Sequence, residues 1–148
     1  MNLRKTTFII LFLMLSAVLC AGQTEPKRKD LPRFVKASPA FAEILLQRTE
    51  FEADLEDLLV AYTLEFPKVK EIRYRLDMLN AEIYKLADVK QEESSKLTLA
   101  LGKLMIRKAD LETDLWNLQK QYSDEHPDVK KIKRKILVFD SAIKDILL

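Results

Sequence analysis

Hydrophobic residues recur every three or four positions through most of the chain beyond residue 40, with charged residues between them. This spacing places the hydrophobic side chains on one face of an α-helix. Four such stripes predict helices near 39–63, 67–87, 95–123 and 127–147, and therefore an all-α protein. Because the spacing is that of coiled-coil seams, we assign the stripes to the core rather than to a ligand site.

Two prolines divide these stripes. Pro67 follows Phe66, and Pro127 follows His126. Proline disfavours helical geometry in the residue before it but fits the first turn of a new helix. Each proline therefore marks a corner between two helices with a short connection, which predicts an antiparallel helical hairpin. The pair Ser38-Pro39 predicts the start of the first helix in the same way.

The two hairpins resemble each other in sequence. A shift of sixty positions superposes 41–88 on 101–148 without a gap and gives 11 identities in 48 positions. The match runs through both corners, so we interpret 38–88 and 101–148 as two copies of one helical-hairpin unit. The corner residues are Tyr62, Glu65, Pro67 and Val69 in the first copy and Tyr122, Glu125, His126, Pro127 and Val129 in the second.

The connector at 89–100 decides how the two hairpins are arranged. A turn there would fold them into a four-helix bundle, whereas a continuous helix would make an extended rod. The segment 87–95 contains no Gly or Pro, and its charged residues interrupt the apolar stripe. A straight helix would keep Ile83 and Leu101 on one face, because eighteen positions make five turns. We favour the bundle over the rod.

The first 22 residues have the pattern of a secretory signal peptide: early cations, an apolar run at 8–21, and small residues at the end. We therefore predict an exported protein, periplasmic or extracellular after cleavage. Lipidation of Cys20 is disfavoured because the bulky Leu19 precedes it. Residues 23–37 are rich in cations and contain two prolines, so we predict a flexible basic arm that acts as a spacer or contacts anionic lipid.

Composition excludes several kinds of site. The chain has 1 Cys and 1 His, which leaves little for a disulfide scaffold, a zinc site or a Cys–His nucleophile. The formal net charge of +2 comes from the two cations of the signal segment, so the remainder is neutral and a nucleic-acid partner is not expected. We predict no catalytic residue, no cofactor and no metal, and no small-molecule substrate is evident.

The densest basic cluster follows the second corner. It consists of Lys130, Lys131, Lys133, Arg134 and Lys135. The first copy has a net charge of −5 and the second +2, counted over 41–88 and 101–148. The cluster could therefore contact the first hairpin, in the same chain or another one, or an anionic polymer or lipid surface. An ordinary solvated helix face is the alternative.

The second corner, from Tyr122 through His126-Pro127 to Lys130, resembles the helical-hairpin segment of bacterial polysaccharide co-polymerases, the chain-length determinant proteins of the envelope. The first corner is similar but has Phe66 in place of the histidine. The resemblance implies long periplasmic helices joined at each corner and a bacterial envelope setting. It gives little reason to infer control of polymer length.

Together these observations predict an exported, non-enzymatic helical-hairpin protein that acts as an interaction or scaffold module in the cell envelope. Its partner would be another protein or a second copy of the chain. The alternative is a periplasmic holding chaperone that grips unfolded clients between its hairpins. An enzyme that uses surface carboxylates is the least favoured hypothesis.

Overall fold

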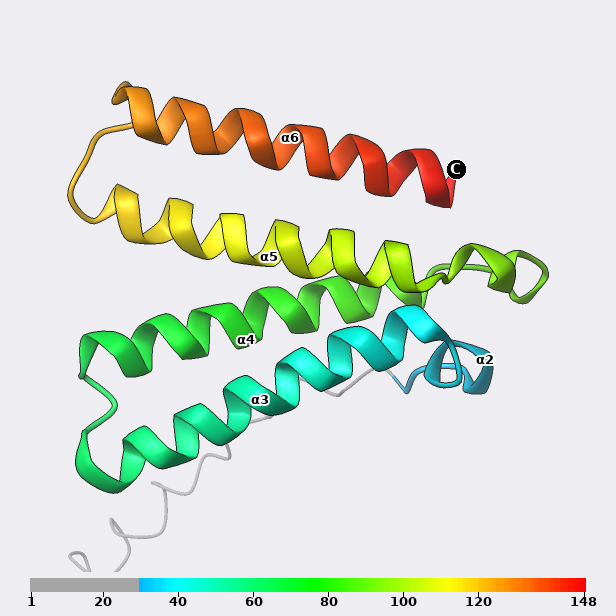
Figure 1. The fold of residues 1–148 in the computed structure, drawn as a ribbon, viewed down its shortest axis with the longest axis horizontal. Helices are drawn as coiled ribbons and strands as arrows, with labels where there is room; N and C mark the ends of the chain where they lie inside the picture. The colour runs from blue at the N-terminus through cyan, green and yellow to red at the C-terminus, as the bar shows by residue number, and fades with distance from the viewer. Residues whose placement is uncertain (1–29) are drawn as a thin grey trace, which may run out of the picture. The chain divides into compact units, whose positions relative to one another are not determined.

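The computed structural model describes residues 30–148, which are α-helical and contain no strand (Figure 1). The elements are α2 (Arg33–Lys36), α3 (Pro39–Ala61), α4 (Pro67–Leu86), the 3₁₀ helix η2 (Gln91–Lys96), α5 (Leu99–Gln119) and α6 (Pro127–Leu147). The all-α prediction is confirmed. The predicted signal peptide at 1–22 lies outside the described residues.

Three of the four long helices begin at the prolines that the sequence singled out. Pro39, Pro67 and Pro127 are each the first residue of a helix, where the missing N–H costs nothing. The hydroxyl of Ser38 also accepts a hydrogen bond from the backbone N–H of Phe41, at 3.2 Å. These local rules account for the positions of α3, α4 and α6.

The start of α5 was predicted wrongly. The expected start was residue 95, but residues 91–96 form a 3₁₀ helix and α5 begins at Leu99. Thr98 is the cap: its backbone is extended and its hydroxyl accepts a hydrogen bond from the N–H of Leu101 at 3.3 Å. The chain therefore turns in the connector, and a continuous helix through 89–100 is not formed.

The long helices lie roughly side by side (Figure 1). Helix α3 packs on both α4 and α5, α4 also packs on α5, and α6 packs chiefly on α5. Because α4 and α5 are neighbours rather than one rod, the extended arrangement is not observed. Helix α6 lies at one edge (Figure 1) and packs chiefly on α5, so the predicted four-helix bundle is not confirmed. The loops at 62–66 and 120–126 lie at the same end (Figure 1).

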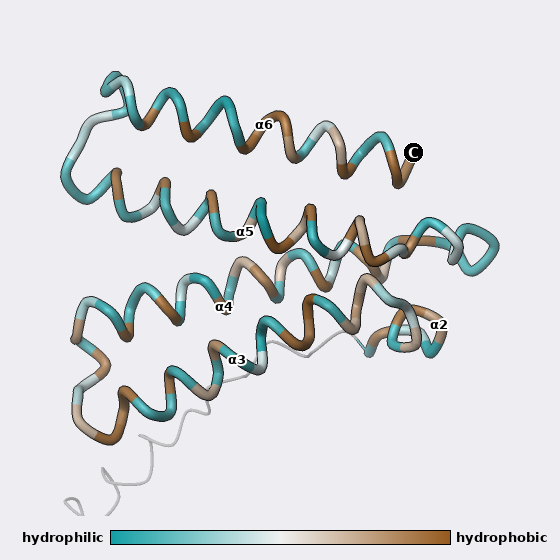
Figure 2. The backbone as a smooth tube through the Cα atoms, in the orientation of Figure 1, coloured by the Kyte–Doolittle hydropathy of each residue, from teal (hydrophilic) through white to brown (hydrophobic). Residues whose placement is uncertain are grey.

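The main hydrophobic core lies toward the other end, where α2 and η2 pack. Apolar positions recur at regular intervals along all four long helices (Figure 2). Val35, Ile44 and Leu97 are fully or almost fully buried in this core together with Leu86 and Met105. The predicted flexible arm at 23–37 is therefore wrong for its last residues: Arg33–Lys36 are helical, and Val35 has no exposed surface.

Gly102 lets α3 approach α5 closely. A Cβ atom at this position would lie 2.8 Å from the carbonyl oxygen of Ala40 and 3.2 Å from Cβ of Glu43. Next to this contact the N–H of Ala40 donates a hydrogen bond to the carbonyl of Leu97, at 3.2 Å. The backbones of two helices thus meet at a point where no side chain fits.

A buried ion-pair network joins α4, α5 and α6. Lys108 on α5 donates hydrogen bonds to Glu82 at 3.0 Å and to Glu112 at 2.8 Å, and Asp140 on α6 lies 4.0 Å away. A long cation on an apolar helix face ordinarily carries its charge to water, but Lys108 is only 5% exposed and Glu82 only 1%. The buried carboxylate of Glu82, on the neighbouring helix α4, receives the charge instead.

Among residues 30–148, no helix is long and apolar enough to cross a membrane.

Candidate functional site: the helix corners and the outer face of α6

The first corner is a compact loop held by backbone hydrogen bonds and one ring stack. The N–H of Tyr62 donates to the carbonyl of Leu58 at 2.9 Å and ends α3, and the N–H of Phe66 donates to Thr63 at 3.1 Å. The rings of Tyr62 and Phe66 stack with their centroids 4.0 Å apart and their planes 10° from parallel. Pro67 then starts α4.

The second corner has the same construction. The N–H of Tyr122 donates to Leu118 at 2.9 Å, and the N–H of His126 donates to Ser123 at 3.0 Å. The ring of Tyr122 stacks on the imidazole of His126 at 4.1 Å, with 27° between the planes. His126 also accepts a hydrogen bond at Nδ1 from the N–H of Asp128, at 3.3 Å, which caps α6. The residue before the proline is thus aromatic in both corners, Phe66 in the first and His126 in the second.

An ion pair spans each corner. Lys70 pairs with Glu65 in the first corner, and Lys130 pairs with Glu125 at 2.5 Å in the second. The hydrogen bond and charge of Lys70 hold the pKa of Glu65 below its ordinary value. Val69 and Val129, one turn into the following helices, have no exposed surface. The nine corner residues that the sequence singled out thus build the corners; they do not converge on a reaction centre.

The two corners differ in the surface that they expose. The first corner exposes Val60 (89%) and Leu64 (53%), whereas Lys120 and Asp124 stand at the equivalent positions of the second. One corner therefore presents an apolar surface and the other a charged one, at the same end of the helices.

The structure divides the predicted basic cluster into two groups. Lys130 is bound by Glu125, and Lys133 pairs with Asp124 at 2.9 Å. Hydrogen bonds from Gln119 and Lys133 keep the pKa of Asp124 below its ordinary value. The other three cations make no ion pair with any residue of the described chain and are exposed; they are Lys131, Arg134 and Lys135. The sequence could not separate the groups, because the partners come from a loop.

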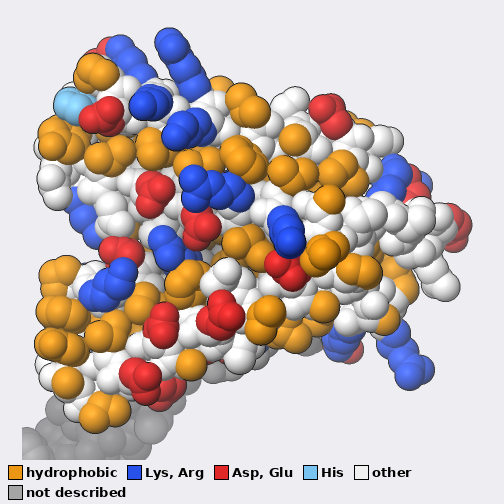
Figure 3. Space-filling view, viewed as in Figure 1, with side chains coloured by type: hydrophobic (Ala, Val, Ile, Leu, Met, Phe, Trp, Pro, Cys, Tyr) orange, Lys and Arg blue, Asp and Glu red, His pale blue; other side chains and the backbone are white. Residues whose placement is uncertain are grey.

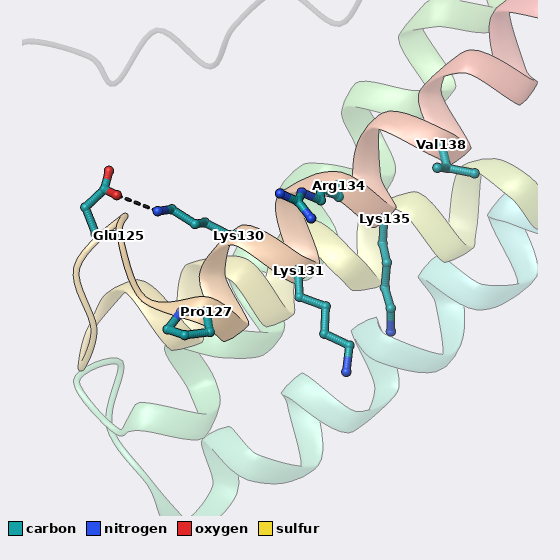
Figure 4. A pocket seen from close by; sticks show the side chains of 7 residues that line it. All are labelled: Glu125, Pro127, Lys130, Lys131, Arg134, Lys135 and Val138. Atoms are coloured by element: carbon teal, nitrogen blue, oxygen red, sulfur yellow. Dashed lines mark hydrogen bonds and ion pairs between the residues drawn. The ribbon is translucent and has the colours of Figure 1, made fainter.

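The free cations line a shallow depression of about 530 Å³ along α6 (Figure 4). Lys131 and Lys135 extend in the same direction from α6, and the Glu125–Lys130 pair lies where α6 begins. Among described residues the depression is lined by Glu125, Pro127, Lys130, Lys131, Arg134, Lys135 and Val138. All seven belong to α6 or to the corner before it, so they form a single wall rather than an enclosed cavity.

Exposed apolar residues continue this face along α6. Leu137 and Val138 are each 67% exposed, one helical turn after Arg134. Basic side chains gather along the α6 edge, with hydrophobic atoms beside them (Figure 3). We call the set Lys131, Arg134, Lys135, Leu137 and Val138 the outer face of α6. Large apolar side chains exposed next to charged ones are typical of a protein-binding surface.

Two aromatic contacts were not foreseen from the sequence. Trp116 on α5 stacks on Tyr74 of α4 with ring centroids 4.7 Å apart, and the ammonium of Lys120 lies 3.1 Å above the Trp116 ring. Trp116 comes directly after Leu115, which belongs to the apolar stripe, so helical periodicity did not assign Trp116 to the core. The ring stack joins α4 to α5, and the Lys120 contact lies at the C-terminal end of α5.

Within residues 30–148, no group of three His, Cys, Asp or Glu side chains is placed to hold a metal ion. Comparison of the chain with family models, with curated proteins and with solved structures found no match.

Proposed function

We propose that this chain is an exported, non-enzymatic helical protein that acts as an interaction or scaffold module in the cell envelope. The signal-like segment at 1–22 and the corner resemblance to envelope co-polymerases support the setting. The helical array supports the scaffold role, because it presents two rigid corners at one end and a helix face at one edge (Figure 1).

The proposal rests chiefly on the exposed residues of the outer face of α6. Helix α6 packs chiefly on α5, which leaves Leu137 and Val138 in water next to three unpaired cations. Exposing such apolar area gains nothing for folding, and it is the kind of surface that a partner covers. The cations would then fix orientation and increase the association rate.

The experiment compares two forms of the immobilised chain in an envelope extract. One is the parent, and the other carries Leu137→Ser and Val138→Ser, which remove the apolar surface but keep every charge. We expect the parent to retain a defined partner, or further copies of the chain, and the variant to lose that retention with an unchanged melting temperature. Equal retention by both forms, or none by either, would refute the proposal.

The first corner favours one alternative, a holding chaperone. Val60, Tyr62 and Leu64 are all exposed, at 89%, 47% and 53%, and unfolded clients bind to apolar surface of this kind. A chaperone should slow the aggregation of a thermally unfolded enzyme at near-equimolar ratio, and Val60→Ser with Leu64→Ser should abolish the effect. An interaction module should leave the aggregation rate unchanged.

A further inference from the structure

The two edge helices carry opposite charge. Helix α3 has six acidic residues and one basic residue, whereas α6 has six basic and three acidic residues. In the fold they lie at opposite edges, with α4 and α5 between them (Figure 1). Acidic side chains are visible along the α3 edge and basic ones along the α6 edge (Figure 3). The two helices therefore cannot neutralise each other within one chain.

Unpaired acids form a group on α3 that matches the cations of α6. Asp54, Glu56 and Asp57 are exposed and make no ion pair with any residue in the range 30–148. The exposed Val60 follows them by one helical turn, just as Leu137 and Val138 follow the three free cations of α6. Each edge thus presents three charges and then an apolar contact. We call the set Asp54, Glu56, Asp57 and Val60 the outer face of α3.

The spacing of the two faces also agrees. A shift of 77 positions carries Asp54 onto Lys131, Asp57 onto Arg134 and Val60 onto Leu137. Two parallel helices in this register would place acid against base twice and apolar against apolar once. The same contact would then pair opposite charges and cover apolar side chains. A like-charged surface would repel, and a purely apolar surface would leave the charges without partners.

We propose that the partner of the outer face of α6 is the outer face of α3 on a second copy of this chain. The inference rests on the proposed interaction function and names its partner. Because the two faces are different and lie at opposite edges, the contact is heterologous: each copy keeps one free face of each kind for the next copy. The chain would therefore form rings or open filaments rather than a closed two-fold dimer.

Charge reversal tests this pairing. One variant carries Lys131→Glu, Arg134→Glu and Lys135→Glu; a second carries Asp54→Lys, Glu56→Lys and Asp57→Lys. In sedimentation velocity at low salt we expect the parent to associate with rising concentration. Each variant alone should associate on the order of a hundredfold more weakly, because like charges then face each other. An equimolar mixture should associate again, since every contact in it pairs opposite charges.

A matched control carries Arg73→Glu, Lys90→Glu and Lys103→Glu, three exposed cations outside both faces. It changes the net charge as much as the first variant does and should associate like the parent. High salt should weaken the association of the parent, because exposed ion pairs are screened.

Three outcomes would overturn the inference: a parent that stays monomeric at every concentration, a mixture that does not associate, or a control that fails like the variants. A monomeric parent that still retains an envelope protein through Leu137 and Val138 would overturn self-association but leave the proposed function standing. A monomeric parent that binds anionic vesicles through the three cations would instead identify a lipid surface as the partner.

Discussion

Lys108 and Glu82 form an ion pair inside the helical array, with 3.0 Å between the ammonium nitrogen and a carboxylate oxygen. The residues come from neighbouring helices, α5 and α4, and both are almost completely buried. Lys85 donates to the same oxygen of Glu82 at 2.6 Å, whereas the second oxygen has no hydrogen-bond partner among described residues. A buried pair of this kind contributes little net stability but makes the loss of one partner costly.

We therefore expect Lys108→Met to lower the free energy of unfolding by about 3 kcal/mol, because Glu82 would lose one of its two cations while it remains buried. The double change Lys108→Leu with Glu82→Leu should recover most of this loss, since an apolar pair needs no compensation. Chemical denaturation measures both. Lys103→Met, at an exposed position of the same helix, is the control and should change stability by less than about 0.5 kcal/mol.

The Lys108–Glu82 pair also predicts how the free energy of unfolding changes at alkaline pH. Burial alone would lower the pKa of Lys108, but the hydrogen bonds and charges of Glu112 and Glu82 outweigh it and raise that pKa well above its ordinary 10.5. A raised lysine pKa stabilises the fold fully below the unfolded-state value and loses this contribution as pH rises toward the folded-state value. The difference in unfolding free energy between the parent and Lys108→Met should therefore be constant up to about pH 10 and shrink above 10.5.

Chemical denaturation of both proteins at a series of pH values between 7 and 11 checks this. If the difference in unfolding free energy already shrinks between neutral pH and pH 9, the pKa of Lys108 is not raised and the assigned ion pair is contradicted.

At Gly102 the structure predicts the sign of the stability change on substitution by alanine. Replacing a glycine inside a helix by alanine ordinarily stabilises the helix by about 1 kcal/mol. At Gly102 the new methyl group would press on the Ala40 carbonyl at 2.8 Å, so we expect Gly102→Ala to destabilise by about 1 to 2 kcal/mol instead. Thermal unfolding measures the direction. A higher melting temperature for this variant would show that α3 does not approach α5 as closely as described.

Two neighbouring residues on α6 should respond differently to the same change. Ile136 is partly buried toward α5, whereas Leu137 is 67% exposed. Ile136→Asp would place an unpaired charge against apolar neighbours and should cost about 2 to 3 kcal/mol. Leu137→Asp should cost less than about 0.5 kcal/mol in dilute solution. If the two variants unfold at the same denaturant concentration, the rotation of α6 on α5 is wrong.

The helices were largely predictable because their determinants are local. The prolines at 39, 67 and 127 and the apolar stripes are visible in any short window of sequence. The start of α5 was missed because Thr98 caps a helix that follows a 3₁₀ turn, for which no Gly or Pro gives a signal. Val35 was assigned to a loose arm because its burial depends on distant residues of the core.

The candidate site was only partly predictable, for the same physical reason. The corner residues lie within nine positions of one another, so the sequence located both corners, although it did not predict the ring stack or the ion pair. Which cations of α6 are free, and which of its apolar residues are exposed, depends on the way α6 packs on α5. Periodicity identifies a helix face but does not reveal which neighbour covers it.

The placement of both corners at one end of the helical array is the central structural claim, and one distance tests it. Spin labels at the exposed loop positions Thr63 and Ser123, in a Cys20→Ser background, would report the separation of the corners by pulsed electron paramagnetic resonance. Side-by-side helices with axes about 10 Å apart predict a separation of roughly 20 to 30 Å. A continuous helix from 67 to 119 would place the corners at opposite ends of a rod, about 80 Å apart at 1.5 Å per residue. A narrow distribution near the shorter value supports the account, and a distance near the longer value would contradict it.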